Sequence, residues 1–381
     1  MKCAVIVVGY NRAESMKRLL DSLCKARYES PCDLIISLDY SSIQQELVEI
    51  GQNVQWSHGE KRIRTFQEKQ KLRKHILQCG DLTSEYDAVI VLEDDLVVAE
   101  NFFQFASEAV AFYKNDDNIA GISLYTHRTN PGNGRPFEAQ FNGYDAFLMQ
   151  YAMSWGQCWT KAQWTKFRSW YDAQDNIADD GVIPSYVVKW NDQSWLKYYI
   201  RYTAEKGLFH VYPYFSLTTN ASEAGEHNEE RSSAYQVPLV YGGVKDYRFP
   251  DVNHAIKYDS YFERLFDDAI FQSSGKTILD LYGLRREFGN ADVLVSTQVL
   301  NYRVIKEIEL QYRPHEVNCI LQESGKGIYV YDLKCFETHK KEDNILKLAR
   351  YDLKAESSRM TLKHGFYGIW LGLRRKIRKR K

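Results

Sequence analysis

Buried strand patterns alternate with amphipathic helix patterns through the first hundred residues, and this alternation constrains the fold more than any other feature of the sequence. Short, continuous apolar runs predict strands at residues 2–9, 33–38, 53–56 and 88–92. Apolar residues at helical spacing predict helices over residues 16–23, 66–77 (a basic helix) and 102–113. Such strands alternating with helices indicate an α/β fold, with a mostly parallel sheet covered by helices on both faces.

Ligands of such sheets bind beyond the carboxyl ends of the strands, so polar residues that follow a strand are candidate site residues. Arg12 follows the first strand and Asp39 ends the second, while three acids, Glu93, Asp94 and Asp95, directly follow the strand at 88–92. Their mutual repulsion is costly unless a cation or hydroxyl donors are present, and a hard divalent ion that bridges a carboxylate and a diphosphate removes it. The alternative is an acid cluster that complements the dipole of the next helix.

The rest of the chain is less regular. Residues 126–145 predict a loop around a short strand, two tryptophan-rich segments predict helices within 153–171 and 189–207, and residues 219–250 are loop-rich. A helical stripe follows at 261–270 and a strand pattern at 328–333. The predicted organisation is a first domain over 1–250 (halves 1–125 and 126–250), a smaller, mixed but mainly helical region over 251–363, and a tail over 364–381.

Charge is segregated along the chain. The sequence holds 50 Lys plus Arg and 50 Asp plus Glu, but its last eight residues read RRKIRKRK, so the body before them is acidic. The neutral total argues against a surface that binds polyanions throughout, and no nucleic-acid partner is expected. The seven cysteines are scattered without a CxxC spacing, which favours reduced thiols in a cytosolic protein.

The sequence also predicts where the protein works. The first apolar run is too short for a signal peptide, and no stretch approaches the roughly 18 apolar residues of a membrane span. Residues 365–373 (GFYGIWLGL), directly before the cationic end, have the composition of an interfacial anchor. We therefore expect a cytoplasmic protein that associates peripherally with the anionic inner face of the cell membrane. The alternatives for the tail are a solvated basic end or contact with an acidic partner.

Four segments, taken in order, resemble a known enzyme family: VIVVGYNRAESMKRLLDSL, LIISLDYSS, YDAVIVLEDDLVVAENFFQFASEAV and SWGQCWTKAQW. They are similar to inverting glycosyltransferases of the GT-A fold, a Rossmann-like nucleotide-sugar-binding fold. Bacterial polysaccharide glycosyltransferases are the nearest relatives, and the animal N-acetylglucosaminyltransferase of N-glycan branching is more distant. The resemblance spans residues 3–228 and is weak after residue 250.

The resemblance implies donor-binding roles in the first half of the chain. Asp95 matches the last acid of the family's metal motif and would bind Mn²⁺ or Mg²⁺, while Glu93 and Asp94 would face the ribose and sugar hydroxyls of a nucleoside diphosphate sugar. Asp39 matches an acid that contacts the nucleotide base, and Arg12 matches a basic residue beside the base and phosphates. For Asp39 and Arg12 the alternative is turn and capping chemistry at the strand ends.

Two further donor-side residues follow from the same resemblance. Arg73 lies on the helix that borders the nucleotide in such enzymes. His227 lies in a loop, residues 220–228, that resembles a segment closing over the donor diphosphate, and it is a candidate second metal ligand or phosphate donor. The alternative for His227 is a solvated loop histidine.

The acceptor side needs a general base. Inversion at a sugar carbon requires a carboxylate that takes the proton from the attacking hydroxyl, and an oxocarbenium-like transition state gains from a nearby anion. Asp192, in WNDQSW, matches the helix start where the family carries its base, although the spacing to Trp195 differs from the animal relative. The alternative is that Asp192 caps the following helix, with Asp179 or Asp180 as substitutes for the base.

Trp155, Gly156 and Trp159 occupy positions where the family builds its acceptor-facing wall. Aromatic faces suit the C–H surfaces of sugars, and a glycine lets a ligand approach the backbone closely. Tryptophans at such spacing also pack in cores, so only one of Trp155 and Trp159 is expected to touch the substrate.

The sequence thus predicts a metal-dependent inverting glycosyltransferase, a hexosyl- or N-acetylhexosaminyltransferase. It would move a sugar from a nucleoside diphosphate sugar, with a UDP-sugar favoured, to a glycan or lipid-linked acceptor in bacterial surface polysaccharide synthesis. One alternative is a sugar nucleotidyltransferase of the same fold, although GYNRAESMKR lacks the Gly-rich phosphate loop of that class. The other is a noncatalytic scaffold.

Overall fold

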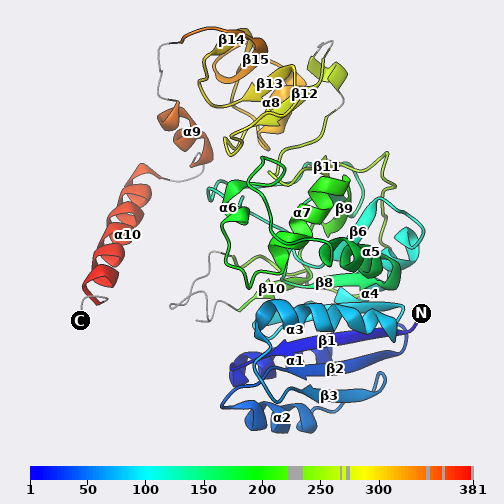
Figure 1. The fold of residues 1–381 in the computed structure, drawn as a ribbon. Coiled ribbons are helices and arrows are strands. Elements are labelled where there is room, and N and C mark those ends of the chain that lie inside the picture. Colours follow the sequence, from blue (N-terminus) through cyan, green and yellow to red (C-terminus); the bar gives the residue numbers. More distant parts are fainter. Residues whose placement is uncertain (222–234, 267, 272–274, 340–343, 354–356, 379–381) are drawn as a thin grey trace.

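The computed structural model describes residues 1–221, 235–266, 268–271, 275–339, 344–353 and 357–378. Within them, nine strands form one mixed, mostly parallel sheet in the order β11-β7-β9-β6-β8-β4-β1-β2-β3 (Figure 1). In chain order its strands are β1 (Cys3–Gly9), β2 (Cys32–Leu38), β3 (Lys61–Thr65), β4 (Ala88–Glu93), β6 (Ile119–Ser123), β7 (Ala146–Met149), β8 (Gln157–Thr160), β9 (Phe209–Pro213) and β11 (Lys257–Tyr258).

The sequence of β1 explains why this sheet has a core on each face. β1 pairs in parallel with β2 and with β4. Successive side chains of a strand point to opposite faces, so a fully apolar strand fits a sheet that is covered on both sides. Alternate residues of β1 enter two different hydrophobic cores: Cys3, Val5 and Val7 the first, and Ala4, Ile6 and Val8 the second.

Helices cover both faces of the sheet. The first core contains buried residues of α1 (Ala13–Lys25), α2 (Gln44–Asn53) and α4 (Phe102–Tyr113). The second contains buried residues of α3 (Lys71–Gly80), α5 (Lys161–Tyr171) and α7 (Leu196–Lys206). The α/β fold with a mostly parallel sheet between helices is therefore confirmed. The short helix α6 (Ser185–Val188), the 3₁₀ turn Asp81–Ser84 and the antiparallel pair β5 (Leu96–Val98) and β10 (Thr218–Asn220) complete this part.

Two local predictions in this part are wrong. No strand forms at 53–56, because α2 ends at Asn53 and the next strand is β3. The sequence of β3, KRIRT, is mostly polar because β3 is an edge strand. The helix predicted to begin at residue 66 begins at Lys71.

A second, four-stranded sheet follows in the order β12-β13-β15-β14. Its elements are β12 (Thr277–Asp280), β13 (Val293–Ser296), β14 (Tyr302–Glu309) and β15 (Gly327–Phe336), with α8 (Glu316–Leu321) between the last two. The prediction that residues 251–363 are mainly helical is therefore wrong, whereas the strand predicted at 328–333 lies within β15 and is confirmed.

In the described residues of 261–270, the predicted helical stripe forms no α-helix, and the one helical element is the 3₁₀ turn Asp268–Phe271. The carboxylate of Asp259 accepts the main-chain N–H groups of Tyr261 (2.8 Å) and Glu263 (3.0 Å), and Phe262 has a φ of 69°. A side chain that binds nearby N–H groups offers the backbone a turn in place of a helix.

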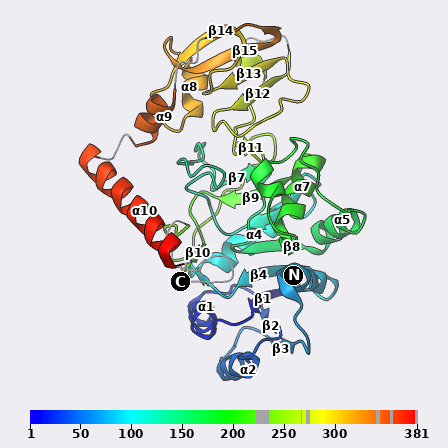
Figure 2. The same cartoon turned by 60° about the vertical axis from the view of Figure 1, so that its left-hand side comes forward.

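The described chain ends in α9 (Ile345–Asp352) and α10 (Ser358–Arg378). In Figures 1 and 2, α10 lies outside both sheets, and its C-terminal end reaches the height of β10. Of the helices in the described residues, none has the apolar length that crossing a bilayer requires. Six large apolar side chains of α10 are exposed: Met360, Leu362, Phe366, Tyr367, Ile369 and Trp370.

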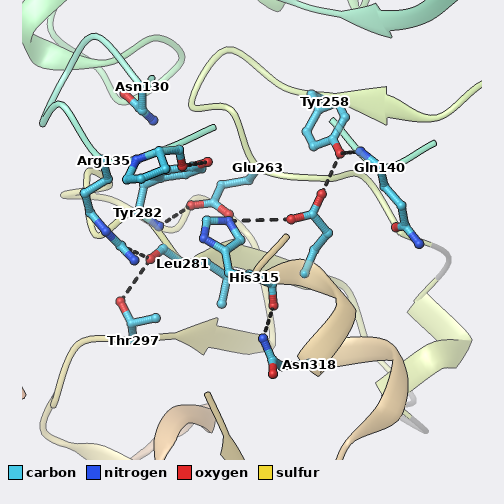
Figure 3. A network of polar contacts seen from close by, with 12 residues as sticks. Asn130, Arg135, Gln140, Tyr258, Glu263, Leu281, Tyr282, Thr297, His315 and Asn318 are labelled. Carbon is cyan, nitrogen blue, oxygen red and sulfur yellow. Dashed lines mark hydrogen bonds and ion pairs between the residues drawn. The ribbon is translucent and has the colours of Figure 1, made fainter. Parts of the chain in front are cut away.

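A buried polar network joins the second sheet to the first (Figure 3). Tyr258 of β11 donates to the carboxyl of Glu316 in α8 (2.5 Å). Arg135, in the long loop before β7, donates to the carbonyl of Leu281 (2.6 Å) and forms an ion pair with Asp352 (2.7 Å). Since β11 pairs with β7, the main sheet continues past residue 250.

The buried Glu316 at this junction predicts a pH-dependent stability. Burial raises its pKa from 4.5 to about 7, although the hydrogen bond from Tyr258 opposes the shift. The folded state therefore favours the protonated carboxyl. Protonation of Glu316 stabilises the folded protein fully below pH 4.5, and this stabilisation is lost as the pH rises to about 7. As the pH rises between those values, the unfolding free energy of wild type should fall by about 3 kcal/mol more than that of Glu316→Gln, which cannot ionise. Urea denaturation measures both free energies.

Glu307→Gln is the matched control, because Glu307 is exposed on β14 of the same sheet. This control should follow the wild-type pH dependence. Identical pH dependence in Glu316→Gln and wild type would show that Glu316 ionises freely in the folded protein.

Candidate functional site

The carboxyl ends of β1, β2 and β4 open into a cavity of about 490 Å³. The parallel register explains why their polar ends meet, because Val8 of β1 lies opposite Glu93 of β4 and Gly9 lies opposite Leu38 of β2. Of the residues predicted to form the site, six line this cavity: Arg12, Asp39, Glu93, Asp94, Asp95 and Trp155. The fold thus brings together polar residues that are distant in the sequence.

The three acids lie where β4 gives way to a turn. Glu93 is the last residue of β4, and Asp94 and Asp95 form the turn before β5. Main-chain hydrogen bonds hold the turn on two sides: the N–H of Asp94 donates to the carbonyl of Val8 (3.0 Å), and the carbonyl of Asp95 accepts from the N–H of Ala221 (2.8 Å). The carboxylates are therefore fixed by backbone contacts with β1 and with the residue after β10.

Arg12, just before α1, bridges two of the acids. Its Nη1 donates to Oδ2 of Asp95 (2.9 Å), and its Nη2 donates to Oδ1 of Asp94. Oδ2 of Asp95 also accepts from Nδ2 of Asn220 (3.0 Å), and the N–H of Tyr10 donates to Oδ2 of Asp94 (3.4 Å). The side chains of Arg12, Asp94 and Asp95 are 23%, 4% and 14% exposed, so their interaction is largely shielded from water.

Arg12 compensates only part of the negative charge. Burial and the charge of Asp95 raise the pKa of Glu93 to about 8, against the effect of Arg12. Burial likewise raises the pKa of Asp94 to about 6, although Arg12 lowers it. Burial disfavours the charged guanidinium of Arg12, but Asp94 and Asp95 outweigh it and raise the pKa of Arg12, which stays charged.

Two carboxylate oxygens at this turn have no protein partner. Glu93 Oε1 and Asp95 Oδ1 are buried and accept no hydrogen bond from the described residues. Because buried carboxyl oxygens without partners are costly, these two fit a further cation, which would displace the proton of Glu93. Across the described ranges no group of three or more His, Cys, Asp and Glu forms a metal site. Glu93 and Asp95 could hold Mn²⁺ or Mg²⁺ together with water or phosphate oxygens, the usual way in which proteins bind Mg²⁺.

Asp39 lines the cavity, but its carboxylate already binds main-chain groups. Oδ1 accepts from the N–H groups of Tyr40 (2.8 Å) and Gln70 (2.7 Å), and Oδ2 accepts from that of Lys71 (3.0 Å). Lys71 begins α3 with a φ of 63°. Asp39 therefore fixes the start of α3 against the end of β2, as the capping alternative predicts. Contact between Asp39 and a nucleotide base stays a prediction.

Arg73 does not line the cavity. Its Nη1 donates to the main-chain carbonyl of Asp192 (2.9 Å) and to the hydroxyl of Tyr198 (3.2 Å), and its guanidinium lies 4.8 Å from the centre of the Tyr198 ring. The structure therefore places Arg73 between α3 and α7, where it holds the segment before α7, and contact between Arg73 and a nucleotide stays a prediction.

Asp192 lies at the rim of the cavity. Its neighbours Asn191 and Gln193 line the cavity, whereas Asp192 does not. Its side chain is 90% exposed, and Oδ1 lies 3.4 Å from Nζ of Lys197. The predicted alternative, that Asp192 caps α7, is wrong: Trp195 occupies the N-cap position, and the hydroxyl of Ser194, not the carboxylate of Asp192, accepts from the N–H of Lys197 in the first turn (3.4 Å). The role of Asp192 as general base stays a prediction.

Asp179 and Asp180, the substitute candidates for the base, contact other residues. Asp179 accepts from Ser185 Oγ (2.7 Å), and Asp180 forms an ion pair with Arg201 (2.5 Å). Neither acid lines the cavity. Asp192, between two residues that do line it, is better placed than either.

The three residues predicted for the acceptor wall occupy different environments. Trp155 is half-buried and lines the cavity. Trp159 has no exposed surface and packs 4.6 Å from Trp164, measured between ring centres, so its predicted contact with an acceptor is wrong. Gly156 has a φ of 100°, and a Cβ there would lie 3.0 Å from the Thr218 side chain. Gly156 therefore permits a turn and close packing, and its predicted approach to a ligand is also wrong.

Several cavity residues were missed on the donor side. Lys69 and Lys71 bring cations to the cavity, and Nζ of Lys69 lies 4.3 Å from the centre of the Tyr10 ring. Nε2 of His75 lies 2.8 Å from Ser37 Oγ, and burial lowers the pKa of His75 to about 4, so its ring is neutral at pH 7. The basic character of segment 66–77 was the available signal for the lysines.

Aromatic residues of the cavity were also missed: Trp190, Trp195 and Tyr235 line it. The available signal was the tryptophan density of segment 189–207, which predicted only a helix. His227 lies outside the described residues, so its role as a metal ligand stays a prediction.

Comparisons with known proteins find partial structural likeness. No protein family profile and no curated protein sequence matches the chain. One similar structure is that of residues 1–349 of S. aureus TarS, solved in complex with UDP-GlcNAc. The aligned part covers 60% of this chain and 60% of that one, with 14% identity and a TM-score of 0.39. The mannosyltransferase PcManGT from Pyrobaculum calidifontis, solved with GDP-Man and Mn²⁺, matches 47% of this chain and 48% of its own with 11% identity and a TM-score of 0.30. A cytidylyltransferase from Leptospira borgpetersenii matches 44% of this chain and 64% of its own with 11% identity and a TM-score of 0.27.

Proposed function

We propose that the protein is a metal-dependent inverting glycosyltransferase that uses a nucleoside diphosphate sugar. The observation that carries this proposal is the pair of buried, unpartnered carboxylate oxygens of Glu93 and Asp95 in a cavity that Lys69 and Lys71 also line. A diphosphate suits both features, because its charge complements the lysines and, through a divalent cation, the acids. The acceptor would be a glycan or lipid-linked sugar of bacterial surface polysaccharide synthesis.

The donor side of the cavity would bind the nucleotide. Arg12, Lys69 and Lys71 would contact the diphosphate, and Glu93 and Asp95 would hold Mn²⁺ or Mg²⁺. The metal would neutralise charge that develops on the diphosphate as it leaves. A UDP-sugar is the favoured donor because of the resemblance to GT-A enzymes.

The acceptor would bind on the aromatic side of the cavity. Trp155 and Trp190, both half-buried, line this side. The apolar faces of such rings pack well against the C–H surfaces of sugars. An acceptor held there would present a hydroxyl toward a donor sugar bound near the acids.

Asp192 is the proposed general base. Inversion requires the acceptor hydroxyl to attack from the side opposite the leaving diphosphate, so the base belongs on the acceptor side. Two contacts of the segment support Asp192: both of its chain neighbours line the cavity, and Arg73 holds its main-chain carbonyl. Its carboxylate would take the hydroxyl proton as the glycosidic bond breaks, and its charge would stabilise an oxocarbenium-like transition state.

We also propose that α10 attaches the enzyme to the inner face of the cell membrane. Its exposed apolar side chains, Phe366, Tyr367, Ile369 and Trp370 among them, lie directly before the cationic residues 374–381. An anionic bilayer would cover the apolar side chains and attract the cations, each of which contributes about 1 kcal/mol near the surface. Lipid-linked acceptors would lie at the same surface.

Two conservative substitutions separate donor binding from chemistry. Asp95→Asn should abolish the thermal stabilisation that a nucleotide sugar gives in the presence of Mn²⁺, because stabilisation follows from affinity.

Asp192→Asn should keep that stabilisation and lower kcat by about 10²- to 10⁴-fold, because it removes only proton transfer. The measurements are a thermal-shift panel of nucleotide sugars with and without Mn²⁺, and release of the nucleoside diphosphate.

Asp175→Asn is the matched control, because Asp175 is exposed and does not line the cavity. Unchanged stabilisation by every nucleotide sugar in Asp95→Asn would refute the metal assignment, and full kcat in Asp192→Asn would place the base elsewhere. Donor binding without turnover would indicate a noncatalytic scaffold. Turnover of a nucleoside triphosphate with a sugar 1-phosphate would indicate a nucleotidyltransferase.

Removal of residues 374–381 tests the membrane proposal. We expect the truncated protein to lose most of its binding to vesicles that contain anionic phospholipid, while its turnover of a soluble acceptor stays nearly unchanged. Vesicle flotation measures the binding, and vesicles of neutral phospholipid are the control. Equal loss of binding and turnover would assign the tail a role in folding instead.

A further inference from the structure

Arg12 already provides a positive charge at the acids proposed to bind a metal. Its two terminal nitrogens contact different carboxylates, one on Asp94 and one on Asp95. A divalent cation at Asp95 would therefore sit beside a guanidinium, which is permanently charged in proteins. In a largely buried site, two like charges at such close range repel strongly.

We propose that Arg12 couples metal binding to donor binding, so that the divalent cation and the diphosphate bind together and each binds weakly alone. This inference rests on the proposed function. The metal alone would be repelled by Arg12, and a diphosphate alone would be repelled by Asp94 and Asp95. When both bind, the diphosphate compensates Arg12 and the metal compensates the acids.

The hydrogen bonds of the two aspartates allow this exchange without collapse of the turn. On Asp95, Oδ2 accepts from both Arg12 and Asn220, whereas Oδ1 is unpartnered. On Asp94, Oδ2 accepts from the N–H of Tyr10. If the guanidinium turns toward a phosphate, each carboxylate therefore keeps one hydrogen bond that fixes its orientation.

The main chain of Arg12 is fixed while its side chain borders the cavity. Its carbonyl accepts from the N–H of Met16 (3.0 Å) in the first turn of α1. The side chain lines the cavity and is 23% exposed, so a bound diphosphate can reach the guanidinium. A rotation of the side chain alone can thus move the positive charge of Arg12 from the acids to a phosphate. Arg12 would then no longer repel a metal at Asp95.

The coupling is tested by Mn²⁺ binding without turnover. Mn²⁺ affinity is measured by electron paramagnetic resonance or calorimetry, with and without UDP, for wild type, Arg12→Met and Arg12→Lys. We expect Arg12→Met to bind Mn²⁺ alone about tenfold or more tightly than wild type, because the repelling charge is gone. UDP should raise its Mn²⁺ affinity by a smaller factor than in wild type. Arg12→Lys keeps the charge and should bind Mn²⁺ alone about as weakly as wild type.

Equal or weaker Mn²⁺ binding by a folded Arg12→Met protein, checked by circular dichroism and melting temperature, would overturn the coupling. Because Arg12→Met leaves Asp94 buried without its cation, the double substitution Arg12→Gln with Asp94→Asn removes both charges of that pair together. This variant should also bind Mn²⁺ alone at least as tightly as wild type, and weaker binding counts against the coupling. Tighter Mn²⁺ binding by these variants, with no response to any nucleotide, would support the repulsion and refute the donor assignment.

Discussion

Three acids at the end of one buried strand are the constraint on which the rest of this site depends. Glu93, Asp94 and Asp95 leave the sheet together, and burial raises the pKa of the first two. One guanidinium, that of Arg12, contacts two of the acids. Arg12 can do so because β1 and β4 pair in parallel, which brings the residues after both strands to the same edge of the sheet. Two carboxylate oxygens still lack partners.

The same edge of the sheet is also connected to the segment before α7. Asp39 holds the start of α3 through main-chain N–H groups, and α3 carries Arg73 across to the carbonyl of Asp192. The cavity is thus lined by acids and cations and also by aromatic residues, among them Trp155 and those of the segment before α7. In the proposed function the first set binds the donor and the second binds the acceptor, and Arg73 holds the main chain at Asp192 in place.

Local apolar pattern and parallel-strand logic predicted β1, β2, β4 and the polar residues that follow them correctly, because these strands are mostly apolar and buried on both faces. The pattern failed where packing or side-chain hydrogen bonds decide the conformation. β3 is polar because it is an edge strand, and Asp259 turns the chain where apolar spacing predicted a helix. The sequence alone does not distinguish Trp155 from Trp159. The tertiary structure shows that Trp159 is buried in the core and that Trp155 lines the cavity.

If Asp95 and a donor diphosphate share one divalent cation, the ion can be located directly. A crystal of the protein grown with Mn²⁺ and UDP, with anomalous diffraction measured at the manganese edge, provides that location. We expect an anomalous peak within bonding distance of an Asp95 carboxylate oxygen and of diphosphate oxygens, with the guanidinium of Arg12 turned toward the phosphates. UDP bound in the cavity without manganese at Asp95, and with Arg12 still on both acids, would contradict the account.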